Sequence, residues 1–372
     1  MNTPRNITIH QPSRLEVGAN TVTQVGDWVG NKRALVITTS PVANHVSRLG
    51  LKGPFTTFED TPPEPNELAL RTILDLAESI KPEVIIGLGG GSVMDLAKLA
   101  AVLWNKNQTL EEVVGLNKVH QKLSTLIQIP TTAGTGSESG IRALVTNSQT
   151  SAKMAVESEH MRADIAILDP TLTYSVPSTV TAATGVDAMA HCVEAFTNIR
   201  AHNMIDDYAR MGMKLIGQYL KRAVANGEDT EAREGMMLAS YYGGICLGPV
   251  NTAAGHALAY PLSTQLHLPH GLANAIIFPH VLAFNADAKP EKTAEILAAL
   301  GLPQSHDPSN VLQAAYAFCI DLGIEMKISK HGANTEVLLQ YAEEAYNIKR
   351  LMNNNPKEMS IKDILAIYKA AF

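Results

Sequence analysis

The chain has 372 residues and a net charge of -6; 45% of its residues are hydrophobic and 18% are charged. This length exceeds the usual size of one hydrophobic core, so two domains are expected. The basic residues form no run and only 5% of the residues are aromatic, which argues against a nucleic-acid partner. No secretion signal and no membrane-spanning apolar stretch are visible, and the three cysteines contain no CxxC pair. We expect a cytoplasmic protein with free thiols and no membrane partner.

The first half of the chain alternates short apolar segments with helical patterns. We predict strands over 34–38, 84–86, 126–130 and 166–168, and helices over 67–80 and 93–104. Continuous apolar strands that alternate with helices are typical of a mostly parallel sheet covered on both faces. An α/β domain is therefore expected over residues 1–177.

The second half has a different character. From residue 178 onward the patterns are helical and rich in Ala, Met and Leu, with no convincing strand. Helices are predicted over 179–196, 206–225, 231–246 and 310–322. We expect an all-helical domain over residues 178–372.

Two loops in the first half have the character of phosphate-binding segments. Gly87-Leu-Gly-Gly-Gly-Ser92 follows a predicted strand and opens a helix, where backbone N–H groups can approach a pyrophosphate. Thr131-Thr-Ala-Gly-Thr-Gly-Ser137 also follows an apolar strand. A tight turn for the first loop and a helix cap for the second are the alternative interpretations. Together the two loops favour a nucleotide site at the carboxyl ends of the strands.

Histidines are concentrated between residues 191 and 280. Asp187 and His191 are four residues apart on a predicted apolar helix, so they share one face. A hydrogen-bonded pair would explain these two residues alone. His256 and His270 add two imidazoles from other apolar segments. Three imidazoles and a carboxylate without thiolate suit a divalent ion such as Fe²⁺ or Zn²⁺.

These motifs occur along the chain together with one further segment near its C-terminal end. The segments 89–95, 130–138 and 185–191 precede Gly255-His256, Leu268-Pro-His-Gly271 and Ile361-Lys-Asp-Ile-Leu-Ala-Ile-Tyr368. In this order they resemble the iron-containing (group III) alcohol dehydrogenases over essentially the whole chain. The resemblance implies a Rossmann-like, dehydroquinate-synthase-like first domain, a helical second domain and a homodimer or larger homo-oligomer.

The resemblance also implies roles for individual residues. The metal, Fe²⁺ or alternatively Zn²⁺, would be held by Asp187, His191, His256 and His270. The cofactor NAD(P) would contact Thr39, Gly90, Gly91, Ser92, Asp95, Thr131, Thr132, Thr135 and Lys153, although Lys153 also fits a solvated surface lysine. The substrate would be a small alcohol or aldehyde.

Three positions leave alternatives open. Tyr260 stands where many members of the family have a further histidine, so it either relays a proton or only shapes the pocket. Thr38-Thr39-Ser40 contains no acid to repel a 2′-phosphate, which leaves NAD and NADP open and slightly favours NADP. Arg142 either pairs with an acidic group on the substrate or forms a structural salt bridge.

The leading hypothesis is a metal-dependent NAD(P) oxidoreductase of small alcohols, diols or aldehydes. A zinc enzyme similar to glycerol dehydrogenase is the related alternative. A lyase similar to dehydroquinate synthase would need several Lys and Arg residues near the metal ligands, and those segments are nearly free of them. A non-catalytic metal- or nucleotide-binding protein would leave the complete set of ligands unexplained.

Overall fold

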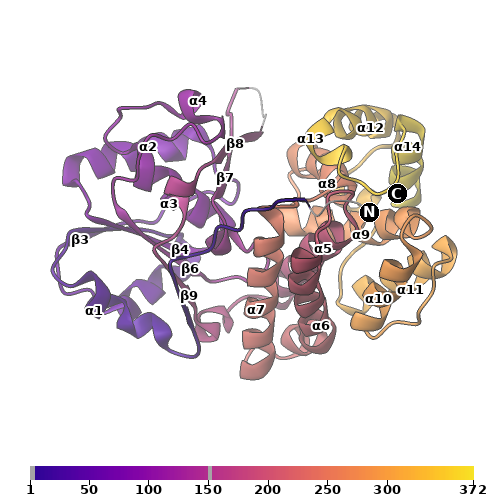
Figure 1. The fold of residues 1–372 in the computed structure, drawn as a ribbon, viewed down its shortest axis with the longest axis horizontal. Coiled ribbons are helices and arrows are strands. Elements are labelled where there is room, and N and C mark those ends of the chain that lie inside the picture. Colours follow the sequence, from indigo (N-terminus) through magenta and orange to yellow (C-terminus); the bar gives the residue numbers. More distant parts are fainter. Residues whose placement is uncertain (1–4, 150–152) are drawn as a thin grey trace. The chain divides into compact units, whose positions relative to one another are not determined.

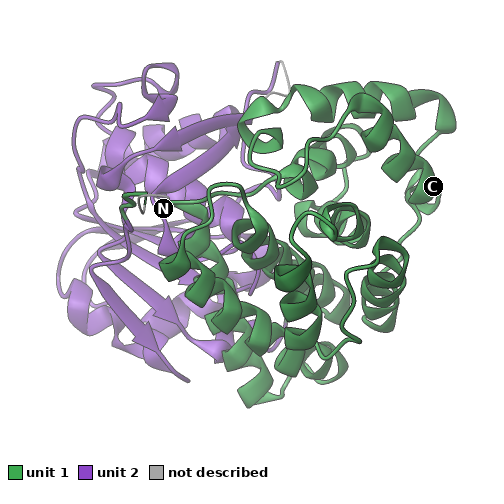
Figure 2. Cartoon of the chain, turned by 45° about the vertical axis from the view of Figure 1, so that its right-hand side comes forward, with its two compact units in different colours: residues 1–8, 176–372 green, residues 9–175 purple. Residues whose placement is uncertain are grey.

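The computed structural model describes residues 5–149 and 153–372. The described chain forms two compact units, one of residues 9–175 and one of residues 176–372 together with 5–8 (Figure 2). The first unit is α/β and the second is helical (Figure 1). The predicted fold class is confirmed.

A parallel sheet forms the centre of residues 9–175. Within the described residues it has six strands in the order β1-β9-β6-β4-β2-β3, and every neighbouring pair is parallel. The strands are β1 (Arg14–Val17), β2 (Ala34–Ile37), β3 (Phe55–Phe58), β4 (Val84–Gly89), β6 (Thr125–Pro130) and β9 (Ile165–Leu168). The four predicted strands are all present, and β1 and β3 are additional.

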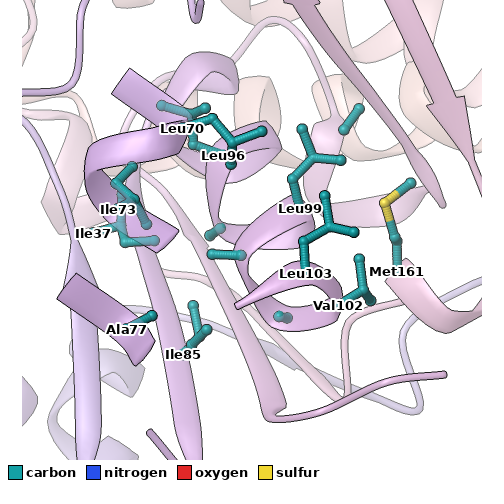
Figure 3. Close-up of a cluster of buried hydrophobic side chains, with 14 of the residues drawn as sticks. Ile37, Leu70, Ile73, Ala77, Ile85, Leu96, Leu99, Val102, Leu103 and Met161 are labelled. Atoms are coloured by element: carbon teal, nitrogen blue, oxygen red, sulfur yellow. The ribbon is translucent and has the colours of Figure 1, made fainter. Parts of the chain in front are cut away.

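Alternate side chains of the central strands belong to two different apolar cores. Leu35 and Ile85 face one core, which they share with α2 (Glu67–Ile80) and α3 (Gly91–Leu103) (Figure 3). Their chain neighbours Val36, Val84 and Ile86 belong to the other core, which includes residues of α1 (Val25–Val29). Because strand side chains alternate between faces, helices on both sides require strands that are apolar throughout.

A second, smaller sheet was not predicted. It contains β5 (Gly115–Leu116), β7 (Arg142–Thr146) and β8 (Lys153–Glu157), in the order β5-β8-β7. β7 and β8 are antiparallel, and alternate residues of β7, Ala143 and Val145, are buried in the core beside α3. The short helix α4 (Leu110–Val113) precedes this sheet and is capped by Thr109.

The unit of residues 176–372 is helical, and the four predicted helices are all present. They are α5 (Ser178–Thr197), α6 (Asn203–Ala225), α7 (Thr230–Leu247) and α11 (Pro308–Asp321). The other helices are α8 (Ala254–Gln265), α9 (His270–Asn285), α10 (Pro290–Ala299), α12 (Leu338–Asn347), α13 (Lys349–Met352) and α14 (Ile361–Ala370). Helix α5 is buried along most of its length and packs against α6, α7, α8 and α9. Among the described residues, no helix combines the length and apolar character that a membrane crossing requires.

Candidate metal centre and nucleotide-binding loops

Helix α5 carries three polar side chains into the helical core. Asp187, His191 and Glu194 are spaced by four and three residues, so they lie on one helix face. Their exposed fractions are 1%, 4% and 7%. Because buried charged and polar groups need partners, this face requires hydrogen bonds or a bound ion.

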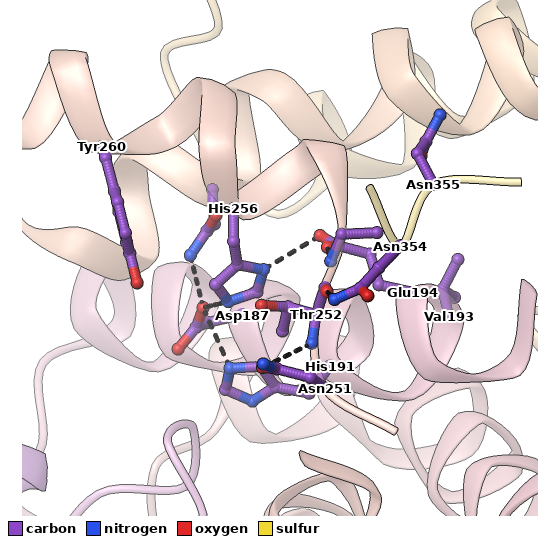
Figure 4. A network of polar contacts seen from close by, with 12 residues as sticks. Asp187, His191, Val193, Glu194, Asn251, Thr252, His256, Tyr260, Asn354 and Asn355 are labelled. Carbon is purple, nitrogen blue, oxygen red and sulfur yellow. Dashed lines mark hydrogen bonds and ion pairs between the residues drawn. The ribbon is translucent and has the colours of Figure 1, made fainter. Parts of the chain in front are cut away.

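Two other helices bring imidazoles to the same place. His256 lies in the first turn of α8 and His270 is the first residue of α9. The Nε2 atoms of His256, His270 and His191 are 3.6, 3.9 and 3.9 Å from Oδ1 of Asp187. Figure 4 shows His256 and His191 beside Asp187. Three imidazoles therefore converge on one carboxylate oxygen.

The four predicted ligands are arranged as a group of three and a close neighbour. Ligand atoms of Asp187, His256 and His270 all lie within 4.8 Å of one another. His191 is not part of this group of three, but its ring stacks on that of His256 with a centroid distance of 4.8 Å. The structure thus brings all four side chains together, with His191 on the side of His256.

The donor set fits a divalent metal ion. Within the described residues, the buried Nε2 atom of His256 has no hydrogen-bond partner. A buried ring nitrogen without a partner is unfavourable, and a bound ion satisfies such an atom. Neutral imidazoles with one carboxylate and no thiolate suit Fe²⁺ or Zn²⁺.

Burial and neighbouring groups set the protonation states within this cluster. Burial raises the pKa of Asp187, but the imidazoles of His191, His270 and His256 outweigh that effect and hold the pKa well below its usual range. Burial lowers the pKa of His191 to about 4. The Asp187 carboxylate therefore stays ionised and His191 stays neutral near pH 7. Burial lowers the pKa of His256, but Glu194 and Asp187 outweigh that effect and raise it to about 10, so metal binding at Nε2 of His256 has to release a proton.

Glu194 is a partner of the cluster that the sequence analysis missed. Its Oε1 is 2.9 Å from Nδ1 of His256, and its Oε2 accepts the backbone N–H of Ala253. A Cβ on Gly255 would lie 2.3 Å from Oε1 of Glu194, so only glycine leaves room for this carboxylate beside His256. The spacing of Glu194 from Asp187 and His191 on one helix face was a signal that could have identified it.

Asn274 is a second missed partner. Its Nδ2 donates to Oδ1 of Asp187 at 2.7 Å and lies 3.1 Å from Nε2 of His270. Asn274 follows His270 by one helical turn on α9, which was again a usable signal. This amide holds two of the predicted ligands in a fixed relation to each other.

Tyr260 borders the cluster. Its ring centroid is 5.9 Å from that of His270, and its hydroxyl accepts a hydrogen bond of 3.1 Å from Nη2 of Arg350. Figure 4 shows Tyr260 beside His256 and Asp187. Nothing in the sequence pattern indicated that Arg350 would lie here.

In residues 9–175, the predicted cofactor loops lie at the carboxyl ends of the central strands of the parallel sheet. The chain leaves β2 toward β3 and leaves β4 toward β6, so the strand order reverses between β2 and β4. Open α/β sheets bind ligands outside the carboxyl ends of the strands at such a reversal. Thr39 follows β2 and Gly90 follows β4, and both therefore lie at this point.

The glycine-rich and threonine-rich loops are in contact. A Cβ on Gly91 would lie 2.8 Å from Cγ2 of Thr135, and the N–H of Thr131 donates to the carbonyl of Gly89 at 3.0 Å. Gly90, at the N-cap of the 13-residue helix α3, offers no side-chain cap to the first N–H groups. Uncapped N–H groups at a helix start bind anions such as phosphate.

Several predicted cofactor residues already have partners within the protein. Ser92 donates to the carbonyl of Pro63. Asp95 accepts from the hydroxyl of Ser137 at 2.6 Å and from the N–H of Leu144 at 2.9 Å, so its carboxylate holds the threonine-rich loop against α3. Thr131 is buried, whereas Thr132 and Thr135 are partly exposed.

Lys153 and Arg142 are both paired with carboxylates. The ammonium of Lys153 contacts Glu64, and the Lys153 side chain is only 16% exposed. Arg142 pairs with Glu157, its cross-strand neighbour on β8, through Nε at 2.9 Å and Nη2 at 2.7 Å. This pairing corresponds to the structural salt bridge that was one of the two interpretations of Arg142.

Comparisons with known proteins agree with this arrangement. Residues 12–170 match the family model of iron-containing alcohol dehydrogenases, and residues 181–372 match that of the family's C-terminal region. The chain is 37% identical to long-chain-alcohol dehydrogenase 1 of Geobacillus thermodenitrificans over 85% of this chain and 81% of the relative. It is also 37% identical to sulfoacetaldehyde reductase of Bilophila wadsworthia, over 83% of this chain and 82% of the relative.

A solved structure shows the same fold. Sulfoacetaldehyde reductase from Bifidobacterium kashiwanohense, in complex with NAD⁺, superposes with a TM-score of 0.89 at 25% identity, and the match covers 99% of each chain. The two family models together span most of the described chain. The chain belongs to the iron-containing alcohol dehydrogenase family and is an oxidoreductase of alcohols and aldehydes.

Proposed function

We propose that the chain interconverts a small aldehyde and its alcohol with NAD(P), using a divalent ion held by Asp187, His191, His256 and His270. Fe²⁺ is the expected ion and Zn²⁺ the alternative. The observation that carries the proposal is the convergence of three imidazole Nε2 atoms on one buried oxygen of Asp187. In this proposal, residues 1–177 bind the cofactor and residues 178–372 hold the metal.

The proposed reaction balances as a hydride transfer. In the reducing direction, a C–H bond forms at the carbonyl carbon with the electron pair of the dihydronicotinamide, and the carbonyl oxygen takes up one proton. When bound, the divalent ion supplies Lewis-acid polarisation of that oxygen. The dihydronicotinamide supplies the hydride, and the protein supplies alignment of the two reactants.

The chain's own residues prepare this site. Glu194 accepts from Nδ1 of His256, so Nε2 of His256, which is directed toward Asp187, is the nitrogen that would bind the ion. Asn274 donates to Oδ1 of Asp187 and thereby orients this carboxylate. Tyr260 borders His270, and because its hydroxyl oxygen accepts from Arg350, its own proton can be donated to a reacting oxygen.

The nicotinamide cofactor enters the proposal as NAD(P). The residues after β2, Thr38 to Ser40, carry no acid, which favours NADP. Asp60 forms a backbone bridge with Thr39, however, and so supplies an acidic residue next to the predicted ribose contact. Parallel measurements of KM and kcat with NADH and NADPH decide between the two cofactors.

The substrate, location and assembly are also part of the proposal. Names of the relatives range from a long-chain-alcohol dehydrogenase to a sulfoacetaldehyde reductase, so they indicate the reaction class more closely than the substrate. We expect a small alcohol or aldehyde, a cytoplasmic location, and a homodimer or larger homo-oligomer.

The test combines metal content with activity. The protein is reconstituted with Fe²⁺ or Zn²⁺ and assayed with a panel of small aldehydes and both reduced cofactors. His256→Ala is expected to lose bound metal and to abolish aldehyde-dependent cofactor oxidation. Wild-type turnover in His256→Ala would overturn the metal assignment, and no cofactor oxidation by the reconstituted wild type with any aldehyde would overturn the proposed function.

A further inference from the structure

Arg350 places an exposed guanidinium beside the candidate metal centre. Its Nη2 donates to the hydroxyl of Tyr260 at 3.1 Å, and its Cζ lies 5.7 Å from the centroid of the Tyr260 ring. The same ring is 5.9 Å from that of His270. The Arg350 guanidinium and the predicted ligand His270 are therefore neighbours of the same tyrosine ring.

The backbone at Arg350 is anchored. Nδ2 of Asn354, a residue with 4% exposure, donates to the carbonyl of Arg350 at 3.1 Å and to the carbonyl of Thr252 at 2.8 Å. Thr252 lies two residues before the start of α8, the helix that carries His256 and Tyr260. The segment that carries Arg350 is therefore tied directly to the segment that leads into the metal-binding helix (Figure 4).

The part of the chain that the structure describes provides no carboxylate to neutralise Arg350. Among the described residues, no carboxylate forms an ion pair with its guanidinium, and the neighbouring Lys349 is also a cation. By contrast, Arg142 is paired with Glu157, and Arg222 is paired with Asp229 and Glu231. A guanidinium presents planar N–H donors that match a carboxylate or sulfonate. Arg350 is thus a ready partner for an anionic group that comes from outside the chain.

We propose that Arg350 selects substrates whose far end is anionic, so that the enzyme prefers short aldehydes and alcohols bearing a carboxylate or sulfonate. This proposal rests on the proposed function, because it places the reacting carbonyl at the metal centre. Tyr260 then has a positioning role: its hydroxyl holds the guanidinium at the border of the site. Arg350 is a substrate-binding residue and takes no part in the hydride transfer.

The experiment compares matched charged and neutral substrates with the metal-reconstituted full chain. The carboxylate arm uses 4-oxobutanoate and its methyl ester, and the sulfonate arm uses 2-oxoethanesulfonate and propanal. The measured quantity is the ratio of kcat/KM for the anionic aldehyde to that for the neutral one. We expect Arg350→Gln to lower this ratio roughly 10- to 100-fold in at least one arm, as loss of a charged hydrogen bond predicts. The loss should appear mainly in KM.

Lys349→Gln is the matched control, because it removes one positive charge from the adjacent residue. The Lys349 ammonium lies over the ring of Tyr346 and not over that of Tyr260. It should leave the ratio at the wild-type value, which separates a specific contact from a general charge effect. Rising salt should lower the ratio in the wild type and leave it unchanged in Arg350→Gln.

The outcomes are distinct. A wild-type ratio near one, or a ratio that Arg350→Gln and Lys349→Gln lower equally, would overturn the role of Arg350 while the proposed function stands. An increase in the cofactor KM that is equal for charged and neutral aldehydes would assign the guanidinium to a cofactor phosphate and would also overturn it. No turnover of any aldehyde by the wild type would instead contradict the proposed function itself.

Discussion

Replacement of Glu194 tests whether its hydrogen bond with Nδ1 of His256 controls metal binding. In the wild type, one carboxylate accepts two bonds, from Nδ1 of His256 at 2.9 Å and from the N–H of Ala253. In Glu194→Gln the side chain keeps its shape but has a single acceptor oxygen. One of the two buried donors must then face an NH₂ group, and either the imidazole turns or the loop before α8 shifts.

The expected magnitude follows from the type of contact. Loss of a carboxylate that orients a metal-bound histidine lowers metal affinity about 10- to 100-fold, which corresponds to about 1.4 to 2.7 kcal/mol. Glu194 is 7% exposed, so water cannot replace the missing acceptor easily. We therefore expect Glu194→Gln to weaken metal binding within this range and Glu194→Ala to weaken it further, because both donors lose their acceptor.

Gly255→Ala provides an independent perturbation of the same contact. Its new Cβ would lie 2.3 Å from Oε1 of Glu194, so the carboxylate must move although Glu194 itself is unchanged. Glu295→Gln serves as the control, since Glu295 is a partly exposed partner of Arg210 in the same helical unit. The assay is chelator competition for Zn²⁺, with the visible spectrum of the Co²⁺-substituted protein as a report of ligand geometry. Wild-type affinity and an unaltered Co²⁺ spectrum in Glu194→Gln would refute the reasoning.

Two further predictions concern stability. Burial raises the pKa of Glu138 from its ordinary value of 4.5 to about 7, so the folded state retains a proton that the unfolded chain releases. This contribution to the free energy of unfolding is present below about pH 4.5 and is lost as the pH rises to about 7. In urea unfolding, the free energy of unfolding of Glu138→Gln should not show that decline. The buried hydroxyl of Tyr368 donates to the carbonyl of Leu258 at 2.6 Å, so Tyr368→Phe should lower the free energy of unfolding by about 1 kcal/mol, whereas Tyr346→Phe serves as a control.

The contradicting results are simple to recognise. If the difference in unfolding free energy between the wild type and Glu138→Gln is constant from pH 4.5 to 8, the pKa of Glu138 in the folded protein is not raised. If Tyr368→Phe unfolds at the same urea concentration as the wild type, the hydroxyl of Tyr368 contributes nothing to the attachment of α14. Both measurements use circular dichroism in parallel with tryptophan fluorescence to check that unfolding has two states.

Local patterns were sufficient to predict the main elements of the fold. β2, β4 and β6 are buried on both sides, so they appear in the sequence as continuous apolar runs between helical patterns. β1 and β3 lie at the edges of the sheet and are partly exposed, which removes that signal. β7 and β8 are partly polar strands whose pairing with each other no local pattern reveals.

The same distinction applies to the candidate site. The sequence by itself determined the types of the four expected ligands and the relation of Asp187 to His191, because that relation depends only on helical spacing. Only the tertiary structure decided which side chains form hydrogen bonds with these ligands and with Tyr260. Glu194 is 62 residues from His256, Asn274 is 87 from Asp187, and Arg350 is 90 from Tyr260. Contacts over such separations depend on how whole helices pack, which a single sequence does not display.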